Sequence, residues 1–243
     1  MEILQDKIFK FKIEKSSDFR FDKSVVDVFD DMVVRSVPFY LEIQRMIAEI
    51  SQEYARPGSS VYDLGCSTGT TLIGLDKMVD SSASFVGVDE SEEMLDKCKT
   101  NFVENNPRRQ MNVVHADLNH GLIIDNASVV ILCLTLQFVR PINRPRLLQS
   151  VYKQLQPGGA LILVEKILCE NSTFNRQFIK FYYEMKKRNH YDEMEIVQKR
   201  EALENVLIPY KISENIQMLE EAQFKSSEVF FKWYNFAGIV AIK

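Results

Sequence analysis

The sequence predicts an α/β protein built on one mostly parallel, doubly wound sheet. Short apolar strands alternate with helical segments between about residue 60 and residue 165, which is typical of parallel strand pairing. Polar, glycine-containing or acidic turns follow the first three strands. The chain then closes on two strands whose very short link permits only an antiparallel hairpin. The length of 243 residues suits one well-buried domain.

The region before the first strand divides into a polar arm and a helical segment. Residues 1–21 show no clear hydrophobic period, and we expect them to form an arm of low order. Residues 22–243 are predicted to form a single domain, whose helical pattern begins at once and lasts to about Ala55. Five apolar residues recur at spacings of three and four on one helical face: Tyr40, Ile43, Met46, Ile47 and Ile50.

Five strands and three helices are expected next. The predicted strands are Ser60–Leu64, Ser84–Val88, Asn112–His115, Ser128–Leu134 and Ala160–Glu165. The predicted helices between them are Thr70–Met78, Ser91–Asn105, with Ser91 as N-cap, and Arg144–Gln154, which Pro157-Gly158-Gly159 should stop. The fourth strand is apolar after its first residue, which favours burial on both faces of a parallel sheet.

The alternation breaks after the fifth strand. Two helices follow each other with no strand between them, and we expect this insertion, residues 170–207, to lie over the carboxyl ends of the strands. The remaining elements are a helix and the final hairpin, so the sheet has seven strands, as in Rossmann-like methyltransferases. The two helices of the insertion are expected at Phe174–Asn189 and Asp192–Leu207. The final helix is expected at Ser213–Ala222, and the two strands of the hairpin at Ser226–Trp233 and Phe236–Ile242.

The strongest local signal is VYDLGCSTG, Val61–Gly69, which ends a strand and opens a helix. Gly65 and Gly69 allow a sharp turn and a close approach of the backbone to a ligand. The helix start offers free N–H groups to a carboxylate. Asp63 suits a ligand ammonium and disfavours a pyrophosphate, so the turn points away from nicotinamide cofactors. The alternative is an ordinary tight turn with no ligand.

Two further acids follow the next two strands. Asp89, 20 residues after Gly69, can accept the hydroxyls of an adenosine ribose. Asp117 ends the third strand, where an acid can meet the adenine amino group. Either acid alone could simply favour a helix N-terminus. Three acids after three successive strands instead predict an S-adenosyl-L-methionine site.

Composition excludes several other classes. The formal net charge of −4 argues against broad binding to nucleic acid, which needs many cations. Cys66, Cys98, Cys133 and Cys169 form no CxxC pair, and the three histidines do not cluster with them, so we expect neither disulfides nor a metal. We also expect no membrane span and a cytoplasmic location, because there is no signal-peptide pattern and the longest apolar run is short.

Five motifs resemble those of the bacterial carboxy-S-adenosyl-L-methionine synthases. The resemblance covers the chain from about Phe21 to its end, and its first and last motifs are absent from general methyltransferases. The motifs are DDMVVRSVPFY (Asp30–Tyr40), VYDLGCSTG (Val61–Gly69), LTLQF (Leu134–Phe138), LQPGGALILVEK (Leu155–Lys166) and QKREALENVL (Gln198–Leu207).

The resemblance implies an activity and a set of site residues. Members convert S-adenosyl-L-methionine and prephenate into carboxy-S-adenosyl-L-methionine and phenylpyruvate, and a partner enzyme uses the product to modify the wobble uridine of tRNA. The implied cofactor positions are Tyr40, Gly65, Cys66, Ser67, Asp89, Glu90, Asp117 and Leu118. Cys133 and Glu90 stand where the family usually has Asn. The implied carboxylate-binding residue is Arg200, which in the family crosses a homodimer interface.

The implied chemistry needs no protein base. Prephenate loses carbon dioxide and hydroxide; the hydroxide removes a proton from the methyl next to the sulfonium, and the ylide captures the carbon dioxide. Arg200 then holds the new carboxylate through two hydrogen bonds. A conventional methyltransferase acting on a small molecule or tRNA is the alternative, and a non-catalytic cofactor-binding subunit is a third. In those cases Arg200 could form a mere surface pair with Glu204.

Overall fold

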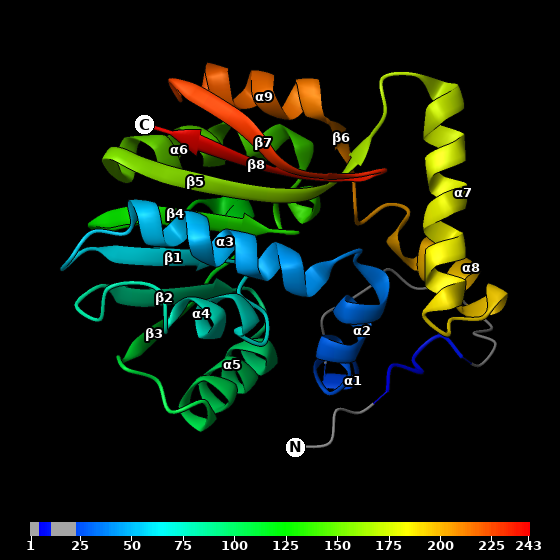
Figure 1. The fold of residues 1–243 in the computed structure, drawn as a ribbon, viewed down its shortest axis with the longest axis horizontal. Helices are drawn as coiled ribbons and strands as arrows, with labels where there is room; N and C mark the ends of the chain where they lie inside the picture. The colour runs from blue at the N-terminus through cyan, green and yellow to red at the C-terminus, as the bar shows by residue number, and fades with distance from the viewer. Residues whose placement is uncertain (1–4, 11–22) are drawn as a thin grey trace.

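The structure is a computed structural model that describes residues 5–10 and 23–243. Its strands are β1 (Ser60–Leu64), β2 (Ser84–Asp89), β3 (Met111–His115), β4 (Ala127–Cys133), β5 (Leu155–Leu168), β6 (Tyr210–Lys211), β7 (Ser226–Trp233) and β8 (Phe236–Ile242). They form a sheet in the order β3-β2-β1-β4-β5-β8-β7, with β6 paired to β5 off this path. Strands β1 to β5 are parallel, and β8 runs antiparallel to both neighbours (Figure 1). The predicted fold class is therefore confirmed.

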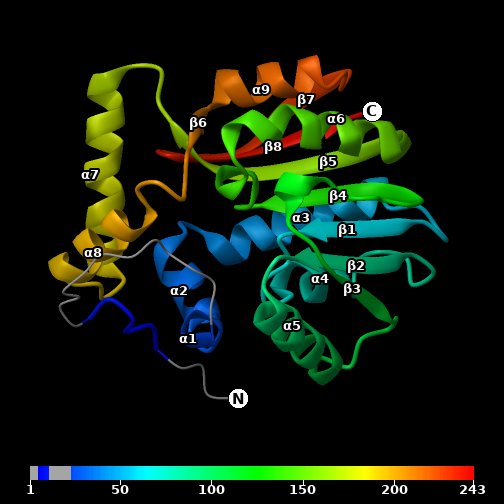
Figure 2. The same ribbon diagram turned by 180° about the vertical axis from the view of Figure 1, so that it is seen from behind.

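Helices cover the sheet and its carboxyl edge. The described helices are α1 (Lys23–Val26), α2 (Phe29–Ser36), α3 (Tyr40–Tyr54), α4 (Thr70–Leu75), α5 (Glu92–Glu104), α6 (Arg144–Gln154), α7 (Ser172–Arg188), α8 (Glu193–Leu203) and α9 (Ile212–Glu221). α3 and α4 lie on one face of the sheet and α6 and α9 on the other (Figures 1 and 2). α7 and α8 stand at the carboxyl ends of the parallel strands, as expected for the insertion. Across the described residues, no helix is both long and apolar enough to cross a membrane.

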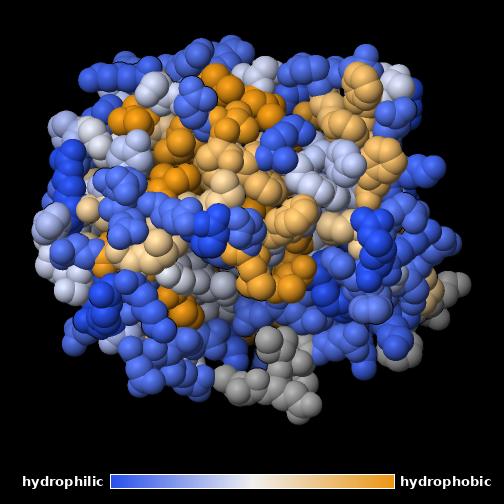
Figure 3. Space-filling view, in the orientation of Figure 1, coloured by the Kyte–Doolittle hydropathy of each residue, from blue (hydrophilic) through white to orange (hydrophobic). Residues whose placement is uncertain are grey.

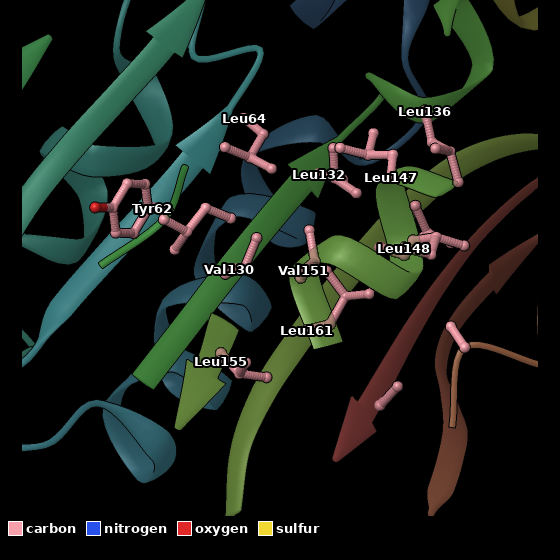
Figure 4. Close-up of a cluster of buried hydrophobic side chains, with 14 of the residues drawn as sticks. Tyr62, Leu64, Val130, Leu132, Leu136, Leu147, Leu148, Val151, Leu155 and Leu161 are labelled. Atoms are coloured by element: carbon pink, nitrogen blue, oxygen red, sulfur yellow. The ribbon is translucent and has the colours of Figure 1, made fainter. Parts of the chain in front are cut away.

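Side-chain alternation along β1 and β4 builds two apolar layers. On one face, Tyr62 and Leu64 belong to a buried cluster with side chains of α6 and α9 (Figure 4). On the other face, Val61 packs in a cluster that includes Ile43 and Ile47 of α3. Every residue of β1 is buried, so both faces of the central strands are covered. The strand ends are held rigidly at the edge where the acidic turns begin.

Helix starts follow capping chemistry. The Ser91 hydroxyl accepts a hydrogen bond from the backbone N–H of Met94 at 3.2 Å, so Ser91 is the N-cap that the sequence predicts. At the start of α8, Asp192 and Glu195 form a reciprocal capping box. This box fixes the direction in which α8 leaves the preceding turn.

Strand β5 is longer than predicted. It begins at Leu155, directly after α6, and runs through Pro157 and the two glycines. The extension is stabilised from the chain end, because Gly158 donates to the Lys243 carbonyl and Lys243 donates to that of Gly159, both at 3.0 Å. The helix ends at Gln154 as predicted, but the predicted start of the strand at Ala160 was wrong, because the end of the chain supplies partners far away in sequence.

Other boundaries also differ. α4 ends at Leu75 and not Met78, and α8 ends at Leu203 and not Leu207. The two-residue β6 was not predicted, since so short a strand has no readable period. The helical region before β1 is three separate helices, with a break at Pro38 between α2 and α3.

The expectation of a poorly ordered arm is wrong for residues 5–10. Asp6 and Phe9 are buried there. The backbone N–H of Asp6 donates to Asp31 at 2.7 Å, and its carboxylate accepts from the Tyr191 hydroxyl at 2.7 Å. The segment thus ties α2 to the turn before α8. The rest of the predicted arm lies outside the described residues.

Candidate functional site

A cavity of about 370 Å³ opens at the carboxyl ends of the parallel strands. The turn after β1, the ends of β2, β3 and β4, and helices α2, α7 and α8 contribute to its wall. This is the edge at which open α/β sheets bind ligands. Ten of the predicted site residues line it: Tyr40, Gly65, Cys66, Ser67, Asp89, Glu90, Asp117, Leu118, Cys133 and Arg200. Asp63 and Gly69 are not among its described lining residues.

The turn after β1 is tight and is held by backbone hydrogen bonds to β2. Gly65 and Cys66 both donate to the Val88 carbonyl, at 2.7 and 2.9 Å. Ser67 adopts a positive φ of 47° and donates its backbone N–H to Asp89 at 2.9 Å. The turn is therefore anchored to β2 by the same carboxylate that the sequence predicts for ribose recognition.

The two glycines of this turn are required chiefly by protein neighbours. Both have positive φ, 82° at Gly65 and 87° at Gly69. A Cβ on Gly65 would collide with the side chain of Thr135, and one on Gly69 would lie 2.7 Å from the sulfur of Cys98. Gly65 also lines the cavity, whereas Gly69 serves the packing of α4 against α5. Packing alone therefore accounts for Gly69, and the approach of a ligand to it stays a prediction.

Asp89, Glu90 and Asp117 form an acidic rim. One Asp89 oxygen accepts from Ser67 and the other from the backbone N–H of Ser91 at 3.0 Å. Burial raises the pKa of Asp89, and partial burial, followed by the charges of Asp117 and Asp89, raises that of Glu90. Asp117 accepts from the backbone N–H of Asn119 at 2.8 Å. Three carboxylates so close favour a positively charged or hydroxyl-rich ligand.

Asp63 is a buried acid whose carboxylate has no hydrogen bond of ordinary geometry among the described residues, although the nearby Thr71 hydroxyl lowers its pKa slightly. Its side chain is in β1, only 1% exposed, and neither carboxylate oxygen has a hydrogen-bond partner by distance and angle among the described residues. Burial, and next the charge of Asp89, raise its pKa to about 7. A buried polar group left without a partner is costly, so an ammonium arriving from the cavity side would stabilise it. This unpartnered acid fits the amino group of S-adenosylmethionine.

Tyr40 and Cys133 also line the cavity. Tyr40 begins α3 and is buried, and burial raises the pKa of its hydroxyl well above the usual value. The Cys133 thiol, at the end of β4, accepts a weak hydrogen bond from Gln44 at 3.7 Å. Burial raises the pKa of this thiol, so it stays protonated and is a poor nucleophile.

Arg200 borders the cavity from α8. Its side chain is 55% exposed, and the nearest carboxylate within ion-pair distance is Glu201 at 3.9 Å, not the Glu204 of the surface-pair alternative. Arg200 also borders a second groove between α7 and α8. The guanidinium is thus open both to its own cavity and to the outer surface of the insertion.

Three lysines on the cavity wall were missed by sequence reasoning. Lys166 follows Glu165 in β5, Lys186 lies on α7, and Lys199 lies on α8 next to Arg200. Lys166 could have been found, since it comes at the carboxyl end of a parallel strand. The two helical lysines gave only one signal, a break in the apolar face of the insertion. In the described chain, no group of three His, Cys, Asp or Glu side chains is arranged to hold a metal.

Comparison with known proteins places this geometry among S-adenosylmethionine enzymes. A family model described as a methyltransferase domain matches residues 61–159. A carboxy-S-adenosyl-L-methionine synthase from Methylococcus capsulatus is 55% identical over 240 residues, covering 98% of this chain and 99% of the relative. A protein of the same name from Desulfotalea psychrophila is 42% identical over 229 residues, 94% and 93% of the two chains.

Solved structures agree on the fold. An O-methyltransferase family protein from Burkholderia thailandensis has a TM-score of 0.66 at 15% identity, over 92% of this chain and 60% of its own. Human N-acetylserotonin methyltransferase in complex with SAM has a TM-score of 0.61 at 13% identity, over 90% and 55%. Both are longer chains, and at such identity the likeness concerns the fold alone.

Proposed function

Because this chain belongs to the carboxy-S-adenosyl-L-methionine synthase family, and is thus an S-adenosylmethionine-dependent transferase, we propose that prephenate is its second substrate. The products are then carboxy-S-adenosyl-L-methionine, phenylpyruvate and water. We further propose that a partner enzyme in the cytoplasm uses the carboxymethyl group to make 5-oxyacetyluridine at the tRNA wobble position. The net charge of −4 supports a division of labour in which this chain does not itself bind the tRNA.

One observation carries the proposal: a cation borders the same cavity as the acidic rim. Asp89, Glu90 and Asp117 suit a cationic adenosyl ligand, while Arg200 suits a carboxylate. A conventional methyltransferase has no use for a guanidinium near the methyl group, because it would disfavour the bound sulfonium. A synthase that creates a carboxylate beside that sulfonium needs such a group.

The roles of the residues follow from their contacts. Asp63 pairs with the ammonium of S-adenosylmethionine, Asp89 accepts from the ribose hydroxyls, and Asp117 with Leu118 borders the adenine. When bound, S-adenosylmethionine supplies an acidified methyl carbon next to its sulfonium. Prephenate supplies both the hydroxide that takes the methyl proton, giving water, and the carbon dioxide that this carbon receives. Arg200 holds the new carboxylate through paired hydrogen bonds.

We also propose that two copies associate through α7 and the uncovered side of the hairpin β7–β8. Phe174 and Phe181 on α7 are 56% and 40% exposed, and Tyr234 at the hairpin turn is 38% exposed. Apolar side chains gather on this face of the molecule, in the part toward the hairpin and α7 (Figure 3). A contiguous apolar patch of this kind marks a protein interface.

The test of the activity is direct. The protein is incubated with S-adenosylmethionine and prephenate, and mass spectrometry follows carboxy-S-adenosylmethionine and phenylpyruvate. We expect both products from the wild type, and neither from Arg200→Ala or Arg200→Lys, since lysine offers only a point charge. Absence of product from folded wild-type protein, with methylation of another acceptor, would establish the conventional methyltransferase instead. Wild-type product levels from Arg200→Ala would remove the role of this residue.

A further inference from the structure

The cavity has a second charged end opposite the acidic rim. Lys166 of β5, Lys186 of α7 and Lys199 of α8 all line it, and they come from three separate elements. Lys186 and Lys199 are each only 5% exposed. Lys166 is partly buried. Lysine is rarely buried unless it is paired, so this group of lysines on one wall requires an explanation.

The ammonium of Lys199 has polar partners in the described protein, whereas those of the other two lysines have only aromatic ones. The Lys199 ammonium donates to the Ser36 hydroxyl at 3.0 Å and lies 3.8 Å from Asp6. The backbone N–H of Lys166 donates to Gln137 at 3.0 Å, but among the described residues neither the Lys166 nor the Lys186 ammonium has a hydrogen-bond or ion-pair partner. Their ammonium groups instead lie 5.2 and 5.0 Å from the centre of the Tyr182 ring.

Lys186 also lies 5.7 Å from the centre of the Tyr191 ring. Aromatic rings are weak partners for ammonium groups that have been removed from water. A cation–π contact stabilises an ammonium by less than its removal from water costs. Burial lowers the pKa of both lysines, and the positive charges of Lys199 and Lys166 lower that of Lys186 further. An anion entering the cavity would relieve both the desolvation and the repulsion between the lysines.

We propose that Lys166 and Lys186 form a carboxylate-binding subsite, separate from Arg200, that holds the carboxylate which the second substrate keeps in its product. The proposal rests on the proposed function, in which one carboxylate of a dicarboxylate is lost and the other remains in a 2-oxo acid. The carboxylate that is lost must lie near the sulfonium. The one that is kept extends toward β5, two strands away from the cofactor turn after β1, where Lys166 and Lys186 flank the ring of Tyr182.

With this subsite, the cavity has one negatively charged end and one positively charged end. Asp63, Asp89, Glu90 and Asp117 surround the place of a cationic cofactor, and the lysines face an anionic co-substrate. Each ligand then strengthens the binding of the other, because the sulfonium offsets the charge of the dianion. Binding of a 2-oxo acid should therefore depend on the lysines, while binding of the cofactor should not.

Calorimetry with phenylpyruvate as the probe tests the subsite on protein preloaded with S-adenosylmethionine. Lys166→Met and Lys186→Met keep the length of the side chain and remove its charge. We expect each to weaken phenylpyruvate binding at least tenfold and to leave the affinity for S-adenosylmethionine unchanged. Lys180→Met is the matched control, since Lys180 lies exposed on the same helix α7 and away from this cavity. It should behave as the wild type.

Two further measurements separate binding from folding and from the reaction itself. Phenylacetone, which lacks the carboxylate, should bind the wild type and the two variants equally weakly. The thermal midpoint of the ligand-free Lys186→Met protein should equal or exceed that of the wild type, because a buried unpaired charge is gone. A structural lysine would instead lower it.

The two proposals fail in different ways. Wild-type affinity for phenylpyruvate in both variants would overturn the subsite, even if the wild type forms carboxy-S-adenosylmethionine. A wild type that binds phenylpyruvate through these lysines but forms no carboxy-S-adenosylmethionine would overturn the reaction and leave the subsite standing.

Discussion

At the scale of a single residue, Asp89 links the turn after β1 to β2. Its two oxygens accept backbone N–H groups from Ser67 and Ser91, which aims the remaining lone pairs into the cavity. The carboxylate can therefore serve two ribose hydroxyls without moving. The same contacts make it a structural residue, so any test of its binding role must also follow folding.

We predict that Asp89→Ala weakens S-adenosylmethionine binding by about 1.5–3 kcal/mol, the range for hydrogen bonds to a charged group. Titration calorimetry measures the change, and thermal unfolding shows whether the turn survives. Asp96→Ala is a suitable control, because Asp96 is 77% exposed on α5 and, within the described part of the chain, forms an ion pair with Lys99 alone. Unchanged cofactor affinity in Asp89→Ala would show that the ribose lies elsewhere.

The buried Asp63 predicts a pH dependence of cofactor binding. Its pKa in the free protein is about 7, far above the value in an unfolded chain, so its ionisation destabilises the free protein as pH rises toward 7. A bound ammonium favours the ionised form and lowers this pKa. Affinity for S-adenosylmethionine should hence rise between pH 5.5 and 7, by up to about tenfold per pH unit, and level off above.

Two comparisons assign that dependence to Asp63. Asp63→Asn should bind S-adenosylmethionine more weakly and without the slope. Methylthioadenosine, which has no amino acid portion, should show no such slope with the wild type. An equal slope for both ligands would mean that another group titrates, and the pairing of Asp63 with the ammonium would be wrong.

At the scale of secondary-structure elements, the sequence pattern predicted most strands of the sheet, but not the pairings between segments that lie far apart along the chain. β1, β7 and β8 begin and end where the sequence indicates, because the glycine-containing turn after β1 and the short link between β7 and β8 leave few alternatives. β6 and the first residues of β5 depend on partners far along the chain, so local sequence carries no signal for them.

The same distinction separates the acidic residues of the site from the basic ones. The acids could be predicted, because a turn after a parallel strand always lies at the ligand edge of the sheet. Lys186 could not, because helix α7 gives no information about where it crosses that edge. The helix itself brings its ammonium to the ring of Tyr182, one turn earlier. Only tertiary packing brings both side chains to the wall of the cavity.

The row of aromatic rings on helix α7 indicates the surface through which two copies would associate. The rings of Phe174, Phe178 and Phe181 follow one another along it, and Tyr234 of the hairpin lies 5.1 Å from Phe181. In a dimer that buries this surface, a carboxylate placed on it would have no partner of opposite charge. We therefore predict that Phe174→Glu with Phe181→Glu yields a monomer by light scattering at micromolar concentration, where the wild type is a dimer.

The control for this prediction is Ile142→Glu. Ile142 is 85% exposed in a short helix, Pro141–Asn143, and lies outside the aromatic row. It should remain dimeric. A monomeric wild type would contradict the proposed assembly, as would a double variant that still dimerises.

At the scale of the whole molecule, the fold sets two sources of charge against each other across one cavity. The strands β1 to β3 and the turns after them supply the acids, and β5 together with the insertion after it supplies the cations. The insertion is also the proposed interface. Assembly and chemistry are therefore expected to depend on each other, and Arg200 is the residue at which the two meet.

Arg200 permits a test of whether one copy completes the site of the other. The family resemblance implies that its guanidinium reaches the neighbouring copy, and its exposed position between the cavity and the outer groove is compatible with this. A heterodimer of Arg200→Ala with Asp89→Ala then contains one intact site. In that site Asp89 comes from the first copy and Arg200 from the second.

We predict that this purified heterodimer, prepared by co-expression with two tags, recovers about half of the wild-type turnover per dimer. Each homodimer should remain inactive at an S-adenosylmethionine concentration that leaves Asp89→Ala unsaturated. If Arg200 instead serves the cavity of its own chain, the copy with intact Asp89 lacks its arginine and the other copy lacks its ribose contact. A heterodimer as inactive as its parents would therefore assign Arg200 to its own chain, even if the protein is a dimer.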